Sequence, residues 1–146
     1  TLGLTLLIIV TIISGGFVAG LKAGKIYNTY PMMGDYWLPP GLFSLQPIWI
    51  NFFENLITVQ LVHRVLTAIT FIAIILYWLK MRKSNLTRRI RTANNTLMNI
   101  AVLQFVLGIS TLILYVPISL AAAHQATALI LLTVALYLSH AQIRGQ

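Results

Sequence analysis

Four apolar stretches of this chain are long enough to cross a lipid bilayer, and they limit its fold more than any other feature. The hydrocarbon core of a bilayer takes about 20 residues of α-helix. Three stretches reach that length outright, and the fourth does so once a few polar residues are tolerated. Hydrophobic residues make up 58% of the sequence and charged residues only 8%, which excludes a disordered chain and argues against an ordinary soluble domain. We therefore predict an all-α, polytopic membrane protein that folds as a single four-helix bundle.

The predicted transmembrane helices span about residues 2–21, 55–79, 90–115 and 117–142. The first two are joined by a long loop, residues 22–54, which contains four prolines and eight aromatic residues. Tyr and Trp favour the membrane–water interface, so we expect this loop to lie there. Within it, residues 44–53 are a candidate interfacial helix. A short basic segment, residues 80–91, joins the second and third helices.

The basic segment sets the expected orientation of the bundle. It holds six of the ten Lys and Arg residues of the chain: Lys80, Arg82, Lys83, Arg88, Arg89 and Arg91. Loops rich in Lys and Arg stay on the cytoplasmic or matrix side of a membrane. We therefore predict that this segment and both chain ends, with Arg144 after the last helix, are inside and that the 22–54 loop is outside. Because the net charge of +8 is concentrated in this way, we expect membrane lipid and not nucleic acid as a partner.

Two histidines lie inside predicted helices at matched depths. His63 follows Asn55 by eight residues and His124 follows Pro117 by seven, and both helices enter from the outer side. At about 1.5 Å per residue, both imidazoles lie roughly 10–12 Å below the outer helix ends. A haem iron with two axial imidazoles needs opposed ring nitrogens at one level, with a gap between helices. The spacing therefore makes His63 and His124 candidate haem-iron ligands.

Other roles for the two histidines stay open. Each imidazole could instead form a hydrogen bond between helices, which predicts a colourless protein. A zinc site is disfavoured because no third and fourth ligand appears at that level. The chain has no cysteine, which excludes a thiolate ligand, a disulfide and a covalently attached c-type haem. His140, at the inner end of the last helix, is expected to be a solvated interfacial residue.

The residues around the two histidines offer space and polar groups. Five alanines surround His124 and leave room for a ring: Ala121, Ala122, Ala123, Ala126 and Ala128. Gln60 shares a helix face with His63, so its amide is a candidate partner for a ring nitrogen or a haem edge. Arg64 is predicted either to pair with a haem propionate or to extend toward the outer surface.

Small residues recur at helical spacing in the first and third predicted helices. Gly16, Gly20 and Gly24 follow one another at intervals of four residues, with Ser14 and Gly15 beside them. This spacing is typical of closely packed membrane helices, and it also offers room for a flat ligand. In the third helix, one polar and small stripe is formed by Gln104, Gly108 and Thr111.

Three segments resemble the C-terminal half of haem A synthase of the alphaproteobacterial and mitochondrial type. They are GGFVAGLKAGKIYNTYPMM (15–33), NFFENLITVQLVHRVLT (51–67) and QFVLGISTLILYVPISLAAAHQATALILL (104–132). The segments occur in the order of the family and span nearly the whole chain. The resemblance implies an eight-helix inner-membrane protein made of two similar four-helix bundles. Such a protein oxidises the C8 methyl group of haem O to a formyl group and so provides haem A for cytochrome c oxidase.

The resemblance also implies a role for this half of such a protein. His63 and His124 match the histidine pair that holds a haem b near the periplasmic or intermembrane side. In the family, the N-terminal half holds the substrate haem O and a functionally important Glu three residues before its first His. Gln60 stands at that position here and cannot act as a carboxylate base, so no catalytic residue is assigned to this half.

Two kinds of activity remain in view for the chain. As half of a haem A synthase it is not expected to be active alone, and haem O synthase and a second copy are its candidate partners. The alternative is a bis-histidine b-type cytochrome subunit that only transfers electrons.

Overall fold

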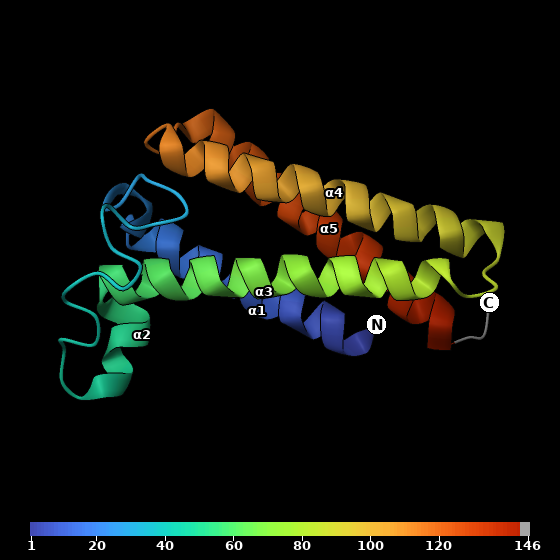
Figure 1. The fold of residues 1–146 in the computed structure, drawn as a ribbon, viewed down its shortest axis with the longest axis horizontal. Coiled ribbons are helices and arrows are strands. Elements are labelled where there is room, and N and C mark those ends of the chain that lie inside the picture. The colour runs from blue at the N-terminus through green and yellow to red at the C-terminus, as the bar shows by residue number, and fades with distance from the viewer. Residues whose placement is uncertain (144–146) are drawn as a thin grey trace.

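The computed structural model describes residues 1–143 as a bundle of four long helices (Figure 1). Each is long and apolar enough to cross a membrane: α1 (Leu2–Gly20), α3 (Leu56–Arg82), α4 (Arg88–Ile113) and α5 (Ile118–Ile143). The loop between α1 and α3 holds three short elements, η1 (Ala23–Lys25), η2 (Ile48–Ile50) and α2 (Asn51–Glu54). No strand occurs in residues 1–143. The predicted all-α membrane fold is confirmed, whereas Arg144 lies outside the described residues.

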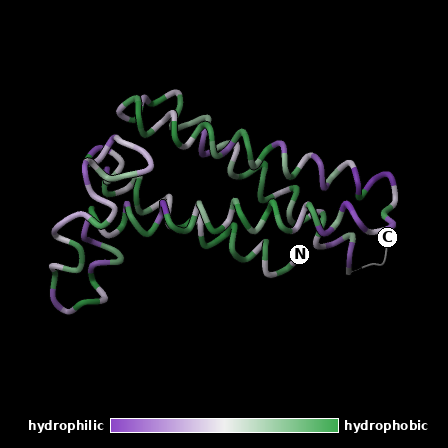
Figure 2. Tube along the Cα trace, viewed as in Figure 1, coloured by the Kyte–Doolittle hydropathy of each residue, from purple (hydrophilic) through white to green (hydrophobic). Residues whose placement is uncertain are grey.

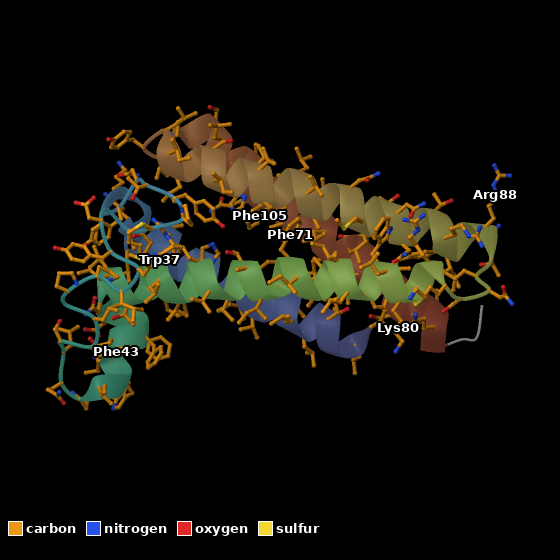
Figure 3. All side chains as sticks on the ribbon, viewed as in Figure 1. Trp37, Phe43, Phe71, Lys80, Arg88 and Phe105 are labelled. Atoms are coloured by element: carbon orange, nitrogen blue, oxygen red, sulfur yellow. The ribbon has the colours of Figure 1, made fainter. Side chains whose placement is uncertain are left out.

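The helices extend further at the end that carries Lys80 and Arg88, which we call the inner end after its predicted orientation (Figure 3). The sequence predicted an irregular basic segment at 80–91, but α3 continues to Arg82 and α4 already begins at Arg88. Most of the basic residues therefore lie on helix ends, because a continued helix satisfies backbone groups that a loop would leave open. At the outer end α4 stops at Ile113, before Tyr115 and Val116, whose positive φ angles of 62° and 60° cannot continue a right-handed helix.

The packing order of the helices places α3 and α5 diagonally opposite each other. α1 packs against α3 and α5, and α4 packs against the same two helices. In Figure 1, α3 and α4 lie close together at the inner end and diverge toward the outer end. The inner half of the bundle is therefore the more tightly closed of the two.

The apolar core lies in this inner half. Its buried members come from all four long helices and include Ile8, Ile74, Leu97, Ala101, Leu131, Ala135 and Leu138. Polar pairs lie among them: the hydroxyls of Thr5 and Ser139 are 2.8 Å apart, and those of Thr11 and Thr70 are 2.7 Å apart. Figure 2 shows hydrophobic residues along much of the helices, hydrophilic residues gathered at the inner end, and a mixture of both at the outer end. The tightly packed core therefore lies at the end of the bundle that is remote from the two predicted haem ligands.

Asparagine side chains hold the outer loop in place. Asn55 begins α3 by accepting hydrogen bonds from the backbone N–H groups of Ile57 and Thr58. Asn51 is fully buried and accepts a hydrogen bond from the Asn55 amide. Asn28 donates to the main-chain oxygen of Leu112 at 2.8 Å and so ties the loop to the end of α4. The predicted interfacial helix at 44–53 is shorter than expected, because regular structure begins only at η2, after Pro47.

Candidate functional site

His63 and His124 lie at one level on the diagonal helices α3 and α5. His63 is seven residues into α3 and His124 is six residues into α5, which corresponds to roughly 9–11 Å from the outer helix ends. Both side chains are partly buried. The structure therefore brings the predicted pair together in one layer of the bundle, which we call the histidine layer.

Each imidazole rests against a glycine of the neighbouring helix. A Cβ added to Gly15 of α1 would lie 3.0 Å from Cε1 of His63, and a Cβ added to Gly108 of α4 would lie 2.9 Å from Cε1 of His124. Gly15 lies five residues before the end of α1, and Gly108 lies five residues before the end of α4. The α1–α3 and α4–α5 pairs thus repeat the same arrangement, and any side chain at these glycines would displace the ring.

Two of the three spaced glycines do not make the contacts that their pattern predicted. A Cβ added to Gly16 or Gly20 would meet no atom within 4 Å, so neither glycine marks a helix contact within the described chain. Gly24 does make a close approach, since its added Cβ would lie 3.2 Å from Cγ2 of Val116. The glycine that lies against the histidine layer is Gly15, which is not a member of the series with four-residue spacing.

Ser14 is hydrogen-bonded to the His63 ring. Its hydroxyl donates to the main-chain oxygen of Thr11 at 2.7 Å, and its oxygen is 2.8 Å from Nδ1 of His63. When the hydroxyl proton is donated to Thr11, the Ser14 oxygen accepts the second bond from Nδ1–H of His63. Nε2 of His63 is then left with a free lone pair, which is the form that binds a metal.

Ser14→Ala is expected to weaken haem binding about tenfold, because outer-shell partners that orient a metal-binding histidine are worth about that much. The midpoint potential of the haem should also rise, since an imidazole without this acceptor is a weaker electron donor. Ser14→Thr keeps the hydroxyl and should restore both properties. Redox titration and haem-loss kinetics of the three proteins measure the effect, and an unchanged potential in Ser14→Ala would contradict this role.

The buried apolar side chains stop short of the histidine layer on α1, α4 and α5, and on α3 Val59 is buried on its outer side, four residues before His63. The outermost ones facing the core are Ile8, Ile74, Ala101 and Leu131. Each lies at least seven residues inward of Gly15, His63, Gly108 or His124 on the same helix, or about 10 Å. Between these levels the buried side chains described are polar: Thr70 on α3 and Thr127 on α5. Since protein interiors are normally close-packed, this polar, partly accessible layer is suited to a bound group.

An aromatic stack lies between α3 and α4 on the inner side of the histidine layer. The rings of Phe71 and Phe105 are nearly parallel, with centroids 4.6 Å apart, and they face each other in Figure 3. Tyr30 of the outer loop meets Phe105 edge-on at 6.2 Å. The sequence analysis missed these residues because a phenylalanine in an apolar helix looks the same whether it faces lipid or the bundle. The only signal was that Phe105 lies three residues before Gly108.

Gln60 and Arg64 hold the outer loop against α3. The Gln60 amide and Nη2 of Arg64 both donate to the main-chain oxygen of Tyr27, each at 2.9 Å. Nη1 of Arg64 donates to the main-chain oxygens of Thr29 and Met32 at 2.9 Å and 3.2 Å. Much of the predicted capacity of Arg64 to bind a propionate is therefore used by the loop.

Several polar atoms near the histidine layer are buried without a hydrogen-bond partner. They are Oε1 of Gln60, Nε of Arg64, Oε1 of Gln104 and Nδ1 of His124. Buried polar groups are nearly always hydrogen-bonded, so unpaired ones require an explanation. A bound group with polar edges would explain them, because it would supply the missing hydrogen-bond partners. His140 is exposed and lies far from this layer on α5, as expected.

A polytopic helical membrane protein with a paired-histidine layer near its outer end is the class that this fold and site define. The chain belongs to the COX15-CtaA family of cytochrome oxidase assembly proteins, whose model matches residues 1–136. It is 47% identical over 143 residues to haem A synthase of Nitrosospira multiformis, covering 98% of this chain and 40% of the relative. It is 46% identical to haem A synthase COX15 of Arabidopsis thaliana over 95% of this chain and 30% of the relative.

The human relative extends the same pattern. Haem A synthase COX15 of Homo sapiens is 48% identical over 132 residues, which is 90% of this chain and 32% of the relative. The chain therefore spans between 30% and 40% of the length of these three relatives. No solved structure matches it. The family expected from the three sequence segments is confirmed.

Proposed function

We propose that this chain is the haem b-binding part of a haem A synthase. In this proposal, the complete protein oxidises the C8 methyl group of haem O to a formyl group and provides haem A for cytochrome c oxidase. The observation that carries it is the diagonal pair of His63 and His124, each resting on a glycine within the polar histidine layer. Relatives named haem A synthase that match over nearly the whole chain support the activity.

The residues of the histidine layer fit a haem with two axial imidazoles. His63 presents a free lone pair at Nε2, and His124 faces the same layer from the opposite helix. A porphyrin supplies the remaining iron ligands itself, so two histidines are sufficient. A zinc ion needs four ligands, and residues 1–143 contain no cluster of three or more His, Cys, Asp or Glu that could hold a metal ion.

A haem held by two imidazoles supplies one-electron transfer and not oxygen activation. The chain itself holds and orients the ligands, through Ser14 for His63 and through Gly15 and Gly108 for the ring positions. Gln60 and Arg64 keep the outer loop over the layer. The unpaired Nε–H of Arg64 remains a candidate donor to a propionate, and Oε1 of Gln60 remains a candidate contact of the haem edge. We assign no catalytic residue here, since Gln60 is neutral, and we place haem O in the part of the protein outside this chain.

The membrane placement follows from the charge at the inner end. We infer an inner membrane, bacterial or mitochondrial, with the basic end in the cytoplasm or matrix. The histidine layer then lies toward the periplasm or intermembrane space. Haem O synthase and a second copy of the protein stay candidate partners.

Expression of the complete gene in cells that lack their own haem A synthase tests this function. We expect extracted haems to include haem A, and we expect the purified protein to give a low-spin, b-type pyridine haemochrome spectrum. Haem b without any haem A would identify an electron-transfer cytochrome instead. A folded but colourless protein would contradict the haem site, and the histidines would then be hydrogen-bonding residues.

A further inference from the structure

The basic inner end of the bundle has no acidic partner within the chain. The sequence has only two acidic residues, Asp35 and Glu54, and both belong to the outer loop. The 27 residues of α3 separate that loop from the inner end by roughly 40 Å, which is several times the Debye length of about 8 Å. The first turn of α4 also carries arginines and no acidic residue, although a helix N-terminus disfavours positive charge. The inner end must therefore find its counter-charge outside this chain.

A polar pocket of about 510 Å³ lies at this end between α3 and α4. It is lined by Trp78, Arg82, Leu86, Arg91, Asn94, Asn95 and Asn99. The guanidinium of Arg82 lies over the Trp78 ring at 4.6 Å, and the indole N–H of Trp78 donates to Oδ1 of Asn95 at 3.0 Å. Trp78 and Arg82 on the α3 wall of the pocket are thus held in place by these two contacts. Two guanidinium groups line the pocket, Arg82 from α3 and Arg91 from α4.

Asn94 lines the same pocket and is only 1% exposed. Its amide nitrogen is 3.5 Å from the main-chain oxygen of Trp78, and its Oδ1 has no hydrogen-bond partner among the described residues. A buried amide oxygen without a donor is rare in native proteins. A ligand that fits this pocket therefore carries a hydrogen-bond donor as well as a negative charge.

Asn95 and Asn99 extend the polar surface of α4 into the membrane. With Arg91 they are spaced four residues apart and cover about 12 Å of one helix face. Amide groups at membrane depth need polar partners, because lipid tails offer none. A headgroup that lies in the groove beside Arg91 and reaches toward Asn99 would meet that need.

We propose that this pocket binds the headgroup of an anionic phospholipid from the inner leaflet. The phosphate lies between Arg82 and Arg91, and a headgroup hydroxyl donates to Oδ1 of Asn94. Basic pockets between transmembrane helices on the cytoplasmic or matrix side are suited to such headgroups. Phosphatidylglycerol has the required chemistry, since it combines a phosphodiester with free hydroxyls. This site is independent of the histidine layer at the other end of the bundle.

The test uses the complete gene product, purified in detergent and stripped of lipid. Phosphatidylglycerol or phosphatidylcholine is added back, and bound lipid is counted and titrated by native mass spectrometry. The Arg82→Gln, Arg91→Gln double variant is compared with Lys83→Gln, Arg88→Gln, which removes the same charge from the same end without touching the pocket. All four side chains are exposed, so both variants should fold and keep the haem spectrum of the parent protein.

We expect one phosphatidylglycerol to be retained in preference to phosphatidylcholine. The pocket variant should bind it about tenfold or more weakly than the control variant does, as expected for lost hydrogen bonds to a charged group. If both variants bound phosphatidylglycerol equally weakly, the proposal would be overturned. Only a diffuse electrostatic attraction between the basic end and the lipid would then remain. Displacement by inorganic phosphate at equal concentration would identify a free anion as the ligand. Crosslinking of Asn95→Cys or Asn99→Cys to the rest of the protein would overturn the proposal, because it would show that protein covers the pocket.

Discussion

His63→Ala and His124→Ala are each expected to remove the proposed low-spin b-type haem from the complete protein. Neither α3 nor α5 carries a second histidine at this level, so no other imidazole of the same helix can replace a lost ligand. Residues 1–143 offer no cluster of alternative metal ligands. Haem occupancy should fall at least about tenfold, because metal-site affinity depends directly on the ligand count. The measurement is a pyridine haemochrome assay per mole of protein, with the spin state read by electron paramagnetic resonance.

His140→Ala is the matched control for this pair. It removes an imidazole from the same helix as His124, but at an exposed position near the inner end. Occupancy and spin state should not change in that variant. If both His63→Ala and His124→Ala kept normal occupancy and an unchanged spectrum, the axial pair would be refuted. A loss of thermal stability with a retained spectrum would indicate the alternative, a hydrogen bond between helices.

The depth of the histidine layer could be predicted from the sequence, whereas its diagonal geometry could not. Depth follows from where a helix begins and from a fixed rise per residue, so His63 and His124 could be compared by counting. The order in which helices pack depends on contacts between distant segments. That α1 and α4 separate α3 from α5 is therefore visible only in three dimensions.

The inner helix ends and the loop contacts were harder to predict, for a different reason. Basic residues near a predicted membrane boundary suggest a loop, yet Arg82 and Arg88 continue regular helices. The carbonyls that Arg64 binds belong to irregular backbone around Tyr27 and Thr29, whose direction no periodic pattern encodes. For this reason the sequence suggested a propionate partner for Arg64 and could not show that the loop already engages most of its guanidinium.

Gly15→Val is expected to reduce haem occupancy about tenfold or more, while the adjacent Gly16→Val leaves it unchanged. An added Cβ at Gly15 lies 3.0 Å from Cε1 of His63, and the branched valine side chain extends further toward the ring. The ring must then turn away from Ser14, and misoriented metal ligands commonly cost 10–100-fold in affinity. An added Cβ at Gly16 meets nothing within 4 Å. Both variants replace a glycine by the same residue in the same turn, so helix propensity changes equally.

Gly108→Val extends the comparison to the second ligand. Its added Cβ would lie 2.9 Å from Cε1 of His124, so we expect a comparable loss of haem through the other helix pair. Haemochrome titration and thermal unfolding of the three variants separate a displaced ligand from a disrupted bundle. A displaced ligand lowers haem occupancy while the haem-free protein unfolds at the same temperature as the haem-free parent. Equal occupancy in Gly15→Val and Gly16→Val would mean that the glycine contact does not position His63, and the repeated arrangement of α1–α3 and α4–α5 would then be a matter of helix packing alone.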